Sequence, residues 1–364
     1  MLVMTRRSFF QKTGATAVAF GILKSQISEL KAAAPNGLPL GSQTYPHAVR
    51  VNCDFPGLLK DMKALGIDAI ELCNPAYGGG WTKLADGKAT RKIADDNGIK
   101  VLSCHFQMNS LRTDLAKQVA WAQELGMIQM STATMSGRVV NGMTTEDEVK
   151  RAAYEYNKIA EGAKAAGMQQ ILHNEGFENS KLIDGRLTYP VLLDYLDPEL
   201  VKMQFQMSGM TTVGNPIMYF QNYPGRFASA HLQGVNTTAG MRVAGPPALP
   251  TKPTAEEAAA AAARGGGAGR GGAGGGGRAA GGPPVDPCAA PAAGRATVPP
   301  PAAPAMGAAA AGGRGGNPPL SLGEDTVNWP AVFAAGKVGG LKTIFIEQNW
   351  EATVKSAAYL KTLT

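Results

Sequence analysis

The sequence predicts an α/β protein of the (β/α)8 barrel type, and three observations support this prediction. Short apolar runs alternate with helix-like segments from residue 37 onward. The alternation provides eight strand candidates, seven connecting segments and a final helix. Residues 35–238 hold the first seven strands and residues 320–364 the eighth, and together they supply roughly the 250 residues that such a barrel needs.

The strand candidates are short apolar runs, and the segments between them have the periodicity of amphipathic helices. The strands begin near Leu38, Ala69, Val101, Met127, Gln169, Val201, Ala228 and Lys342. Apolar residues recur at spacings of three and four in residues 55–65, 115–125, 145–166 and 191–196, and residues 351–363 form the final helix. Gly66, Gly126 and Gly167 follow three of these segments, because glycine adopts the left-handed helix cap without strain.

A segment from about Ala239 to Pro319 interrupts the predicted barrel between its seventh and eighth strands. It contains 18 of the 46 glycines between Gly265 and Gly316, and Ala and Pro make up most of the rest. With few large apolar side chains, it cannot bury enough surface to offset its chain entropy. We predict a disordered insertion over residues 239–319 that leaves the barrel on its catalytic face. Arginines precede some of its glycines, as in nucleic-acid-binding segments, but no aromatic residue is interleaved.

The first 34 residues resemble a twin-arginine export signal. Arg6 and Arg7 are followed by Phe9, by a moderately apolar stretch and by three alanines that end at Ala34. The apolar stretch is too short for a permanent membrane span. We therefore expect a periplasmic or otherwise exported protein that meets the twin-arginine translocase. The alternative is a basic amphipathic start of a cytosolic protein, and Pro35 leaves the cleavage point open.

Charge and cysteine content exclude further classes of protein. The formal net charge is +7, of which the first 34 residues and residues 235–320 contribute +4 each, so about −1 remains for the barrel. The barrel therefore shows no nucleic-acid-binding footprint. The four cysteines (Cys53, Cys73, Cys104 and Cys288) lack a C-x-x-C spacing and predict neither a zinc knuckle nor a disulfide framework. We expect Cys73 and Cys104, in strand-like runs, to be buried free thiols.

Every histidine lies at or just past the end of a strand candidate. They are His47, His105, His173 and His231, and the eighth strand ends in Glu347. Parallel α/β folds gather the carboxyl ends of their strands around one pocket. The pattern therefore predicts a polar, possibly metal-binding site. The alternative is that these residues only solvate the rim, and we expect His47, in a loop, to be a surface residue.

Four strings resemble the sugar phosphate isomerase/epimerase family, whose members have the xylose isomerase-like TIM barrel. They are Pro39-Leu40-Gly41-Ser42-Gln43-Thr44-Tyr45, His173-Asn174, Tyr223-Pro224-Gly225-Arg226-Phe227 before His231, and Ile346-Glu347-Gln348. The resemblance covers most of residues 37–234 and 320–364. No single string is highly specific, but their order and spacing together are.

The resemblance implies one divalent metal ion, manganese, zinc or magnesium. Family members usually hold it with a Glu or His from the fifth strand, an Asp from the sixth, a His from the seventh and a Glu from the eighth. The matching positions here are His173 or Glu175, Gln206, His231 and Glu347. Gln206 departs from the pattern, because a neutral carbonyl is a poorer ligand for a hard cation than a carboxylate.

The string after the seventh strand also departs from the family. The usual His-x-Lys-Asp reads His231-Leu232-Gln233-Gly234 and loses both charged residues. These changes leave two functions open. The missing Asp and Lys favour a catalytically degenerate barrel that binds a carbohydrate without turnover. The retained histidines and glutamates favour an enzyme.

As an enzyme, the chain would be an isomerase, epimerase or related lyase of a sugar or keto-sugar. The family's chemistry removes a proton next to a carbonyl, with a metal ion to stabilise the enediolate. The resemblance implies that Glu347 and Glu175 act as acid/base residues. It also implies that His105 and Glu71, at the ends of the third and second strands, contact the substrate, although Glu71 alone could be a rim carboxylate.

Overall fold

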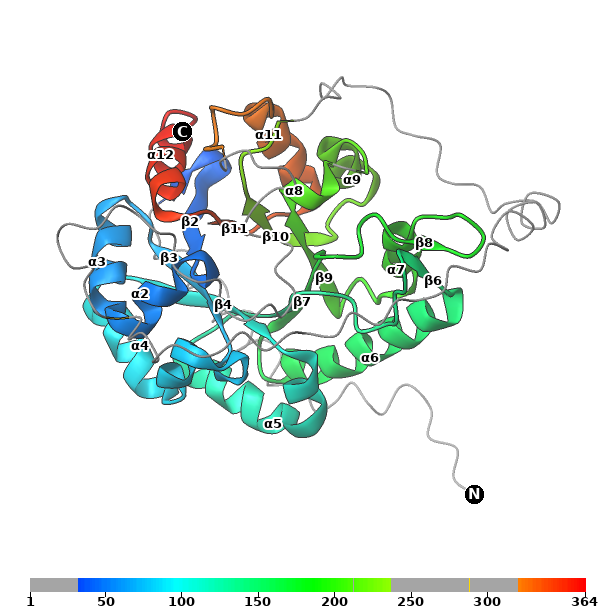
Figure 1. The fold of residues 1–364 in the computed structure, drawn as a ribbon, viewed down its shortest axis with the longest axis horizontal. Coiled ribbons are helices and arrows are strands. Elements are labelled where there is room, and N and C mark those ends of the chain that lie inside the picture. Colours follow the sequence, from blue (N-terminus) through cyan, green and yellow to red (C-terminus); the bar gives the residue numbers. More distant parts are fainter. Residues whose placement is uncertain (1–31, 212, 237–287, 289–319) are drawn as a thin grey trace, which may run out of the picture.

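A closed barrel of eight parallel strands, surrounded by helices, forms the body of the protein (Figure 1). The computed structural model describes residues 32–211, 213–236, 288 and 320–364. The barrel strands are β2 (Leu38–Gln43), β3 (Ala69–Cys73), β4 (Lys100–Phe106), β5 (Gln129–Thr132), β7 (Gln169–His173), β9 (Val201–Gln206), β10 (Phe227–Leu232) and β11 (Thr343–Ile346). The barrel closes because β2 pairs in parallel with both β3 and β11. The predicted fold class is thus confirmed, and each predicted strand is present.

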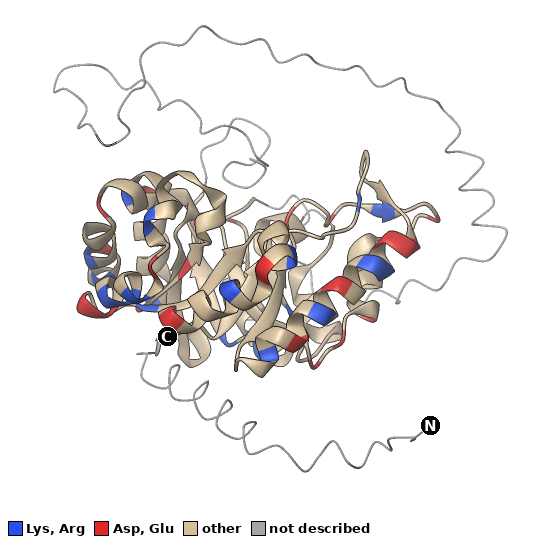
Figure 2. Cartoon of the chain, turned by 90° about the horizontal axis from the view of Figure 1, so that it is seen from below, with Lys and Arg blue, Asp and Glu red and all other residues tan. Residues whose placement is uncertain are grey.

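The helices lie outside the barrel and connect successive strands (Figure 1). They are α2 (Ala48–Cys53), α3 (Phe55–Ala64), α4 (Gly87–Asp96), α5 (Met108–Leu125), α6 (Glu146–Ala165), α7 (Thr188–Tyr195), α8 (Met207–Met210), α9 (Pro216–Asn222), α11 (Trp329–Gly339) and α12 (Trp350–Lys361). Short 3-10 turns are η1 (Pro35–Gly37), η2 (Tyr45–His47), η3 (Pro75–Tyr77) and η4 (Gly79–Leu84). Figure 2 shows acidic and basic residues interspersed along these outer helices.

Local signals set the helix ends. Gly66, Gly126 and Gly167 have φ angles of 76°, 76° and 81°, the left-handed conformation expected after a helix. Helix α5 begins seven residues before the predicted segment, but Asp114 breaks its helical geometry with φ −156°. The Asp114 carboxylate accepts a hydrogen bond from the Lys117 amide, as an N-cap does. The sequence pattern therefore detected the part of α5 that follows this internal cap.

An apolar cluster lies inside the barrel, below the polar side chains near the carboxyl ends of the strands. Ala69, Leu102, Ile128 and Phe345 form a buried apolar cluster of their own. Since alternate residues of a strand share one face, Glu71 lies on the same side as Ala69. The floor of the barrel is thus a packed apolar layer, and the polar side chains lie above it at the carboxyl ends of the strands.

Several elements lie beside the barrel. Strand β1 (Ala32–Ala34) pairs antiparallel with β2, and Ala34 is buried. β1 belongs to the predicted export signal, whose other residues, 1–31, lie outside the described part of the chain. The predicted insertion, 239–319, also lies outside it, except for Cys288. Strands β6 (Met143–Thr144) and β8 (Lys181–Leu182) form a separate two-stranded sheet.

A disulfide joins Cys53 to Cys288, so the expectation that the cysteines form no disulfide is wrong for this pair. The two residues are separated by 235 positions, and their Cα atoms lie 5.3 Å apart. That separation fits a disulfide, but sequence spacing cannot reveal it because only the fold brings the two thiols together. Cys73 and Cys104 are buried free thiols, as predicted. No helix in the described part of the chain is long and apolar enough to cross a bilayer.

Candidate active site

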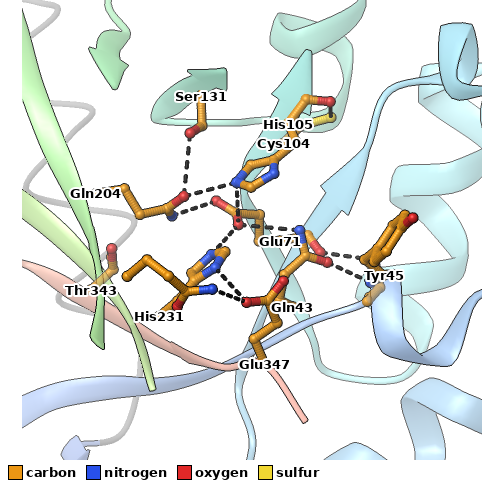
Figure 3. A network of polar contacts seen from close by, with 12 residues as sticks. Gln43, Tyr45, Glu71, Cys104, His105, Ser131, Gln204, His231, Thr343 and Glu347 are labelled. Carbon is orange, nitrogen blue, oxygen red and sulfur yellow. Dashed lines mark hydrogen bonds and ion pairs between the residues drawn. The ribbon is translucent and has the colours of Figure 1, made fainter. Parts of the chain in front are cut away.

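Five side chains from five strand ends meet above the apolar floor (Figure 3). Glu71 comes from β3, His105 from β4, Gln204 from β9 and His231 from β10, while Glu347 follows β11 directly. All five are buried, with exposures between 0% and 7%. The prediction that polar strand-end residues converge is therefore fulfilled for Glu71, His105, His231 and Glu347.

The carboxylate of Glu71 is the centre of the network. Its Oε1 accepts hydrogen bonds from His231 Nε2 at 2.6 Å and Gln43 Nε2 at 3.3 Å, and it forms an ion pair with His105, whose Nε2 lies 3.1 Å away. Its Oε2 accepts a hydrogen bond from Gln204 Nε2 at 2.8 Å. Burial by itself would raise the pKa of Glu71, but the two facing histidines outweigh it and hold that pKa well below its ordinary value. Glu71 is thus a buried anion and not a rim carboxylate.

Gln204 determines which nitrogen of His105 carries a proton. Its amide oxygen accepts from His105 Nε2 at 2.8 Å and from the Ser131 hydroxyl at 3.3 Å. A carboxamide oxygen can only accept, so His105 Nε2 is the protonated nitrogen. When the ring is neutral, Nδ1 retains the lone pair. Burial lowers the pKa of His105, but Glu71 and the hydrogen bond to Gln204 together outweigh it, and the net direction is upward.

His231 lies between two carboxylates. Its Nε2 is 2.6 Å from Glu71 Oε1, and its Nδ1 is 3.2 Å from Glu347 Oε2. Because both partners accept, this arrangement requires a proton on each ring nitrogen. Burial lowers the pKa of His231, but the two carboxylates outweigh it and raise the pKa to about 10. Glu347 Oε2 also accepts from Gln206 Nε2 at 2.7 Å and Gln233 Nε2 at 2.8 Å.

His173 differs from the other two site histidines. Neither of its ring nitrogens has a hydrogen-bond partner among the described residues, although the side chain is fully buried. The amide oxygen of Gln206 also lacks a partner within the described part. Burial lowers the pKa of His173 well below its ordinary value, and the nearby His231 and His105 lower it further. His173 is therefore neutral and offers a lone pair with which an ion or a water molecule could interact.

The donor set fits a metal ion. One nitrogen from each of His105, His173 and His231 lies within 4.8 Å of the others, so the three buried histidines could hold a metal ion. Neutral imidazole is a common metal ligand. The unpaired atoms of His173 and Gln206 are the direct structural argument for a cation here. Binding through His231 would require that ring to release a proton, because both nitrogens face carboxylates.

The predicted metal ligands differ in how closely the structure brings them together. Gln206, His231 and Glu347 contact one another, and the His173 ring lies 4.5 Å from that of His231. His105, expected to contact substrate, belongs to the histidine cluster, with its ring 5.0 Å from His173. Whether these residues bind a metal ion and substrate stays a prediction.

Glu175, in the loop after β7, is the carboxylate suited to proton exchange. Burial raises its pKa to about 7, and the negative charge of Glu347 contributes in the same direction. A carboxyl group with a pKa near neutrality can both accept and return a proton. Within the described part of the chain, no side-chain hydrogen bond or ion pair holds the Glu175 carboxyl group, so Glu175 differs from the tightly held Glu71 and Glu347.

His47 is not a surface residue, and that prediction is wrong. Its side chain is only 4% exposed and packs edge-on against Trp350, with ring centroids 5.8 Å apart. The turn η2 directs His47 toward the start of α12, and burial lowers its pKa to about 4. The physical reason is that a loop residue on the catalytic face can be covered by the loop that follows the last strand.

Sequence reasoning missed Gln43 and Gln204, the amides that bind Glu71. A usable signal existed for Gln204, because Gln204 and Gln206 are two residues apart on one strand and therefore share a face. If Gln206 faces the barrel, Gln204 does too. Gln43 ends its strand within the string that carried the family resemblance, yet an uncharged side chain gave no chemical indication of its role.

Comparisons with known proteins give the fold its context. No family model matches the chain, and no curated protein matches it. Among solved structures, a sugar phosphate isomerase/epimerase from Parabacteroides distasonis is similar, with 18% identity, coverage of 90% of this chain and 95% of that chain, and a TM-score of 0.58. A D-tagatose 3-epimerase-like protein has 12% identity, coverage of 90% and 97%, and a TM-score of 0.52. These likenesses establish the fold, a closed (β/α)8 TIM barrel.

Replacing Gln206 by Asp should tighten divalent-metal binding about tenfold, since each 1.4 kcal/mol is a factor of ten. Without metal, the new carboxylate should lower the melting temperature, because Gln206 Nε2 now donates to Glu347 Oε2 and Asp would bring a like charge there. Glu347→Gln should weaken metal binding instead. Calorimetric titration of zinc and manganese measures the affinities. Unchanged affinity in both variants would mean that these positions do not share a metal ion.

Glu175 should make the stability of the metal-free protein depend on pH. Its pKa is raised from 4.5 to about 7, so the folded state favours the protonated form. The free energy of unfolding should therefore fall as pH rises from about 4.5 through about 7, by on the order of 3 kcal/mol. Denaturant unfolding of Glu175→Gln should lack this decline, and the exposed Glu161→Gln should retain it. Parallel profiles for wild type and Glu175→Gln would contradict the assignment.

Proposed function

We propose that the chain is an exported, metal-dependent isomerase or epimerase that acts on a sugar or keto-sugar by removing a proton next to the carbonyl. The observation that carries the proposal is the unpaired, neutral His173 beside His231 and Glu347 at the carboxyl ends of the barrel strands. This is the face where TIM-barrel enzymes carry their active sites. The fold shared with solved sugar isomerases and epimerases is consistent with it.

His173 and His231 would hold the metal ion, together with Gln206 and Glu347 or with His105. A divalent ion bound there would polarise the substrate carbonyl and stabilise the enediolate. Imidazole nitrogens suit zinc, whereas manganese and magnesium prefer carboxylate and carbonyl oxygens. Three histidines and a neutral amide therefore favour zinc among the expected ions. Gln204 would orient His105 and Glu71 would orient His231, because their side-chain oxygens accept hydrogen bonds from these rings. Gln204 also donates a hydrogen bond to Glu71.

Glu175 and Glu347 would move the proton. Glu175 can take a proton from the substrate carbon and return it near neutral pH, because its pKa is about 7. One carboxylate oxygen of Glu347, Oε2, accepts hydrogen bonds from Gln206, Gln233 and His231. That restraint fixes the carboxylate direction, as a positioned acid/base group requires.

A degenerate, carbohydrate-binding barrel is the second candidate, and one observation favours it. The charged groups neutralise one another, because His231 is bound by two carboxylates and amides occupy the positions of the expected Asp and Lys. A site that satisfies itself in this way can bind hydroxyl groups without supplying a free base.

Exchange of substrate protons with solvent separates the two candidates. Metal-loaded protein should exchange the proton next to the carbonyl of a keto-sugar into D2O, followed by 1H NMR over a panel of free and phosphorylated ketoses. Glu175→Gln and Glu347→Gln should each slow exchange at least a hundredfold, the lower range for a lost acid/base group. The exposed Glu161→Gln is the matched control. Binding of a sugar without any exchange would establish the binding protein and reject the enzyme.

Export is proposed on two independent features. The Arg6-Arg7 string resembles a twin-arginine signal, and the Cys53–Cys288 disulfide suits an oxidising compartment. Replacing both arginines by lysine should retain the protein inside the cell, where Cys53 and Cys288 should react with an alkylating reagent under denaturing conditions. The wild-type protein from the exported fraction should show two fewer reactive thiols. Equal distribution of the two forms, with equal thiol counts, would reject the proposal.

A further inference from the structure

The chain contains three Asn-Gly dipeptides, and the structure holds them in different ways. They are Asn36-Gly37, Asn97-Gly98 and Asn141-Gly142. In such a dipeptide the backbone nitrogen of the glycine can attack the side-chain amide of the asparagine, because glycine has no Cβ atom to hinder the approach. The attack needs a free asparagine side chain and a glycine N–H that is not engaged elsewhere. The sequence makes the three dipeptides equivalent, so the structure decides which one reacts.

Hydrogen bonds restrain two of the three dipeptides. The Asn36 side chain donates from Nδ2 to the Phe333 carbonyl oxygen at 2.7 Å. The Asn97 side chain donates to a carbonyl oxygen in the last turn of α4 at 2.8 Å, and Asn97 is the C-cap of that helix. The Gly98 amide donates to the Asp95 carbonyl oxygen at 2.9 Å. These bonds must break before either glycine nitrogen can reach the asparagine side chain.

The dipeptide Asn141-Gly142 lacks these restraints. Both residues have left-handed backbone angles, with φ of 51° and 75°, and they join Val140 to Met143 in a hairpin turn of the kind that favours Asn-Gly. In the described part of the chain, neither the Asn141 side chain nor the Gly142 N–H has a hydrogen-bond partner. A Cβ atom placed on Gly142 would meet no atom within 4 Å, so the turn stands clear of its neighbours.

We propose that Asn141 is a modification site, at which the chain deamidates spontaneously and before the other two dipeptides. The Gly142 nitrogen loses its proton to hydroxide and bonds to Cγ of Asn141. The bond from Cγ to the side-chain nitrogen breaks, and that nitrogen takes up a proton from water and leaves as ammonia. Water then opens the resulting cyclic imide at either carbonyl and gives aspartate or isoaspartate. The reaction consumes water alone, so it is independent of the proposed function.

The turn connects two loops at the catalytic face, β6 lying beside β8 at the periphery of the barrel (Figure 1). The Lys181 amide, in the loop after β7, donates to the Gly142 carbonyl oxygen at 2.9 Å. Val140 and Met143 exchange two hydrogen bonds of 2.9 Å. Isoaspartate leads the main chain through the former side chain and lengthens it by a methylene group, so these bonds cannot all persist. Aspartate keeps the main chain and adds only a charge.

Ageing of the purified full-length protein tests the proposal. The protein is incubated in mildly alkaline buffer made with water enriched in the heavy oxygen isotope, which labels only carboxyl groups formed before digestion. It is then digested at acid pH for peptide mass spectrometry. The Asn141 peptide should gain label at least about fivefold faster than the Asn36 and Asn97 peptides, the factor that one hydrogen bond to be broken corresponds to. In denaturant the three rates should become similar.

The order of labelling decides the outcome. Equal rates for the three peptides in the native protein would overturn the proposal, and so would earlier labelling of Asn36 or Asn97. Label at Asn141 in denaturant alone would show that the folded turn protects the residue and would also overturn it. Asn141→Gln should abolish labelling at this position, because attack would have to close a larger ring, and should leave the other two rates unchanged.

Hydrogen exchange tests the structural effect of the modification. The isoaspartate-rich fraction of aged protein, isolated by ion exchange, should exchange the Lys181 amide at least about fivefold faster than fresh protein. Freshly purified Asn141→Asp is the matched control, because it carries the new charge on an unaltered main chain and should keep the protection of Lys181. Equal protection in the aged and fresh proteins would overturn the effect on β6 and β8.

Discussion

The contact between the Glu71 carboxylate and the His231 ring, 2.6 Å apart at zero exposure, is the interaction on which the site depends. An isolated buried charge is very costly, so each group requires the other. The remaining members of the network follow from this pair. Gln43, Gln204 and His105 satisfy the other positions around Glu71, and Glu347 binds the second nitrogen of His231. Removing either partner would leave the other with a single charged neighbour, His105 for Glu71 and Glu347 for His231.

Much of the fold could be predicted because it follows from local patterns. The apolar strands, the helices with spacing of three and four, and Gly66, Gly126 and Gly167 depend on neighbouring residues alone. The convergence of His105, His173, His231 and Glu347 also followed, since topology gathers strand ends whatever their sequence separation. The predicted signal and insertion fall almost entirely outside the described residues, so they remain predictions.

The features that the sequence did not predict depend on contacts between segments far apart in the chain, which no local pattern encodes. The pairing of Cys53 with Cys288 and the burial of His47 under Trp350 both join segments more than two hundred residues apart. Gln43 and Gln204 were missed because amides are neutral and their importance comes from the carboxylate they meet. Neutral amides also distinguish the site from the family pattern. Gln206 and Gln233 donate hydrogen bonds to Glu347, but they lack the charges of the Asp and Lys that the family resemblance implies at these positions.

The disulfide gives the chain the topology of a closed ring with two tails. The ring runs from Cys53 to Cys288 and contains six of the barrel strands, β3 to β10. The other two, β2 and β11, lie on the tails and pair with each other. A force applied to the two ends of the chain would therefore separate this seam and could extend only the tails. The six enclosed strands would remain within a covalent loop. β2 and β11 could pair with β3 and β10 again when the force is released.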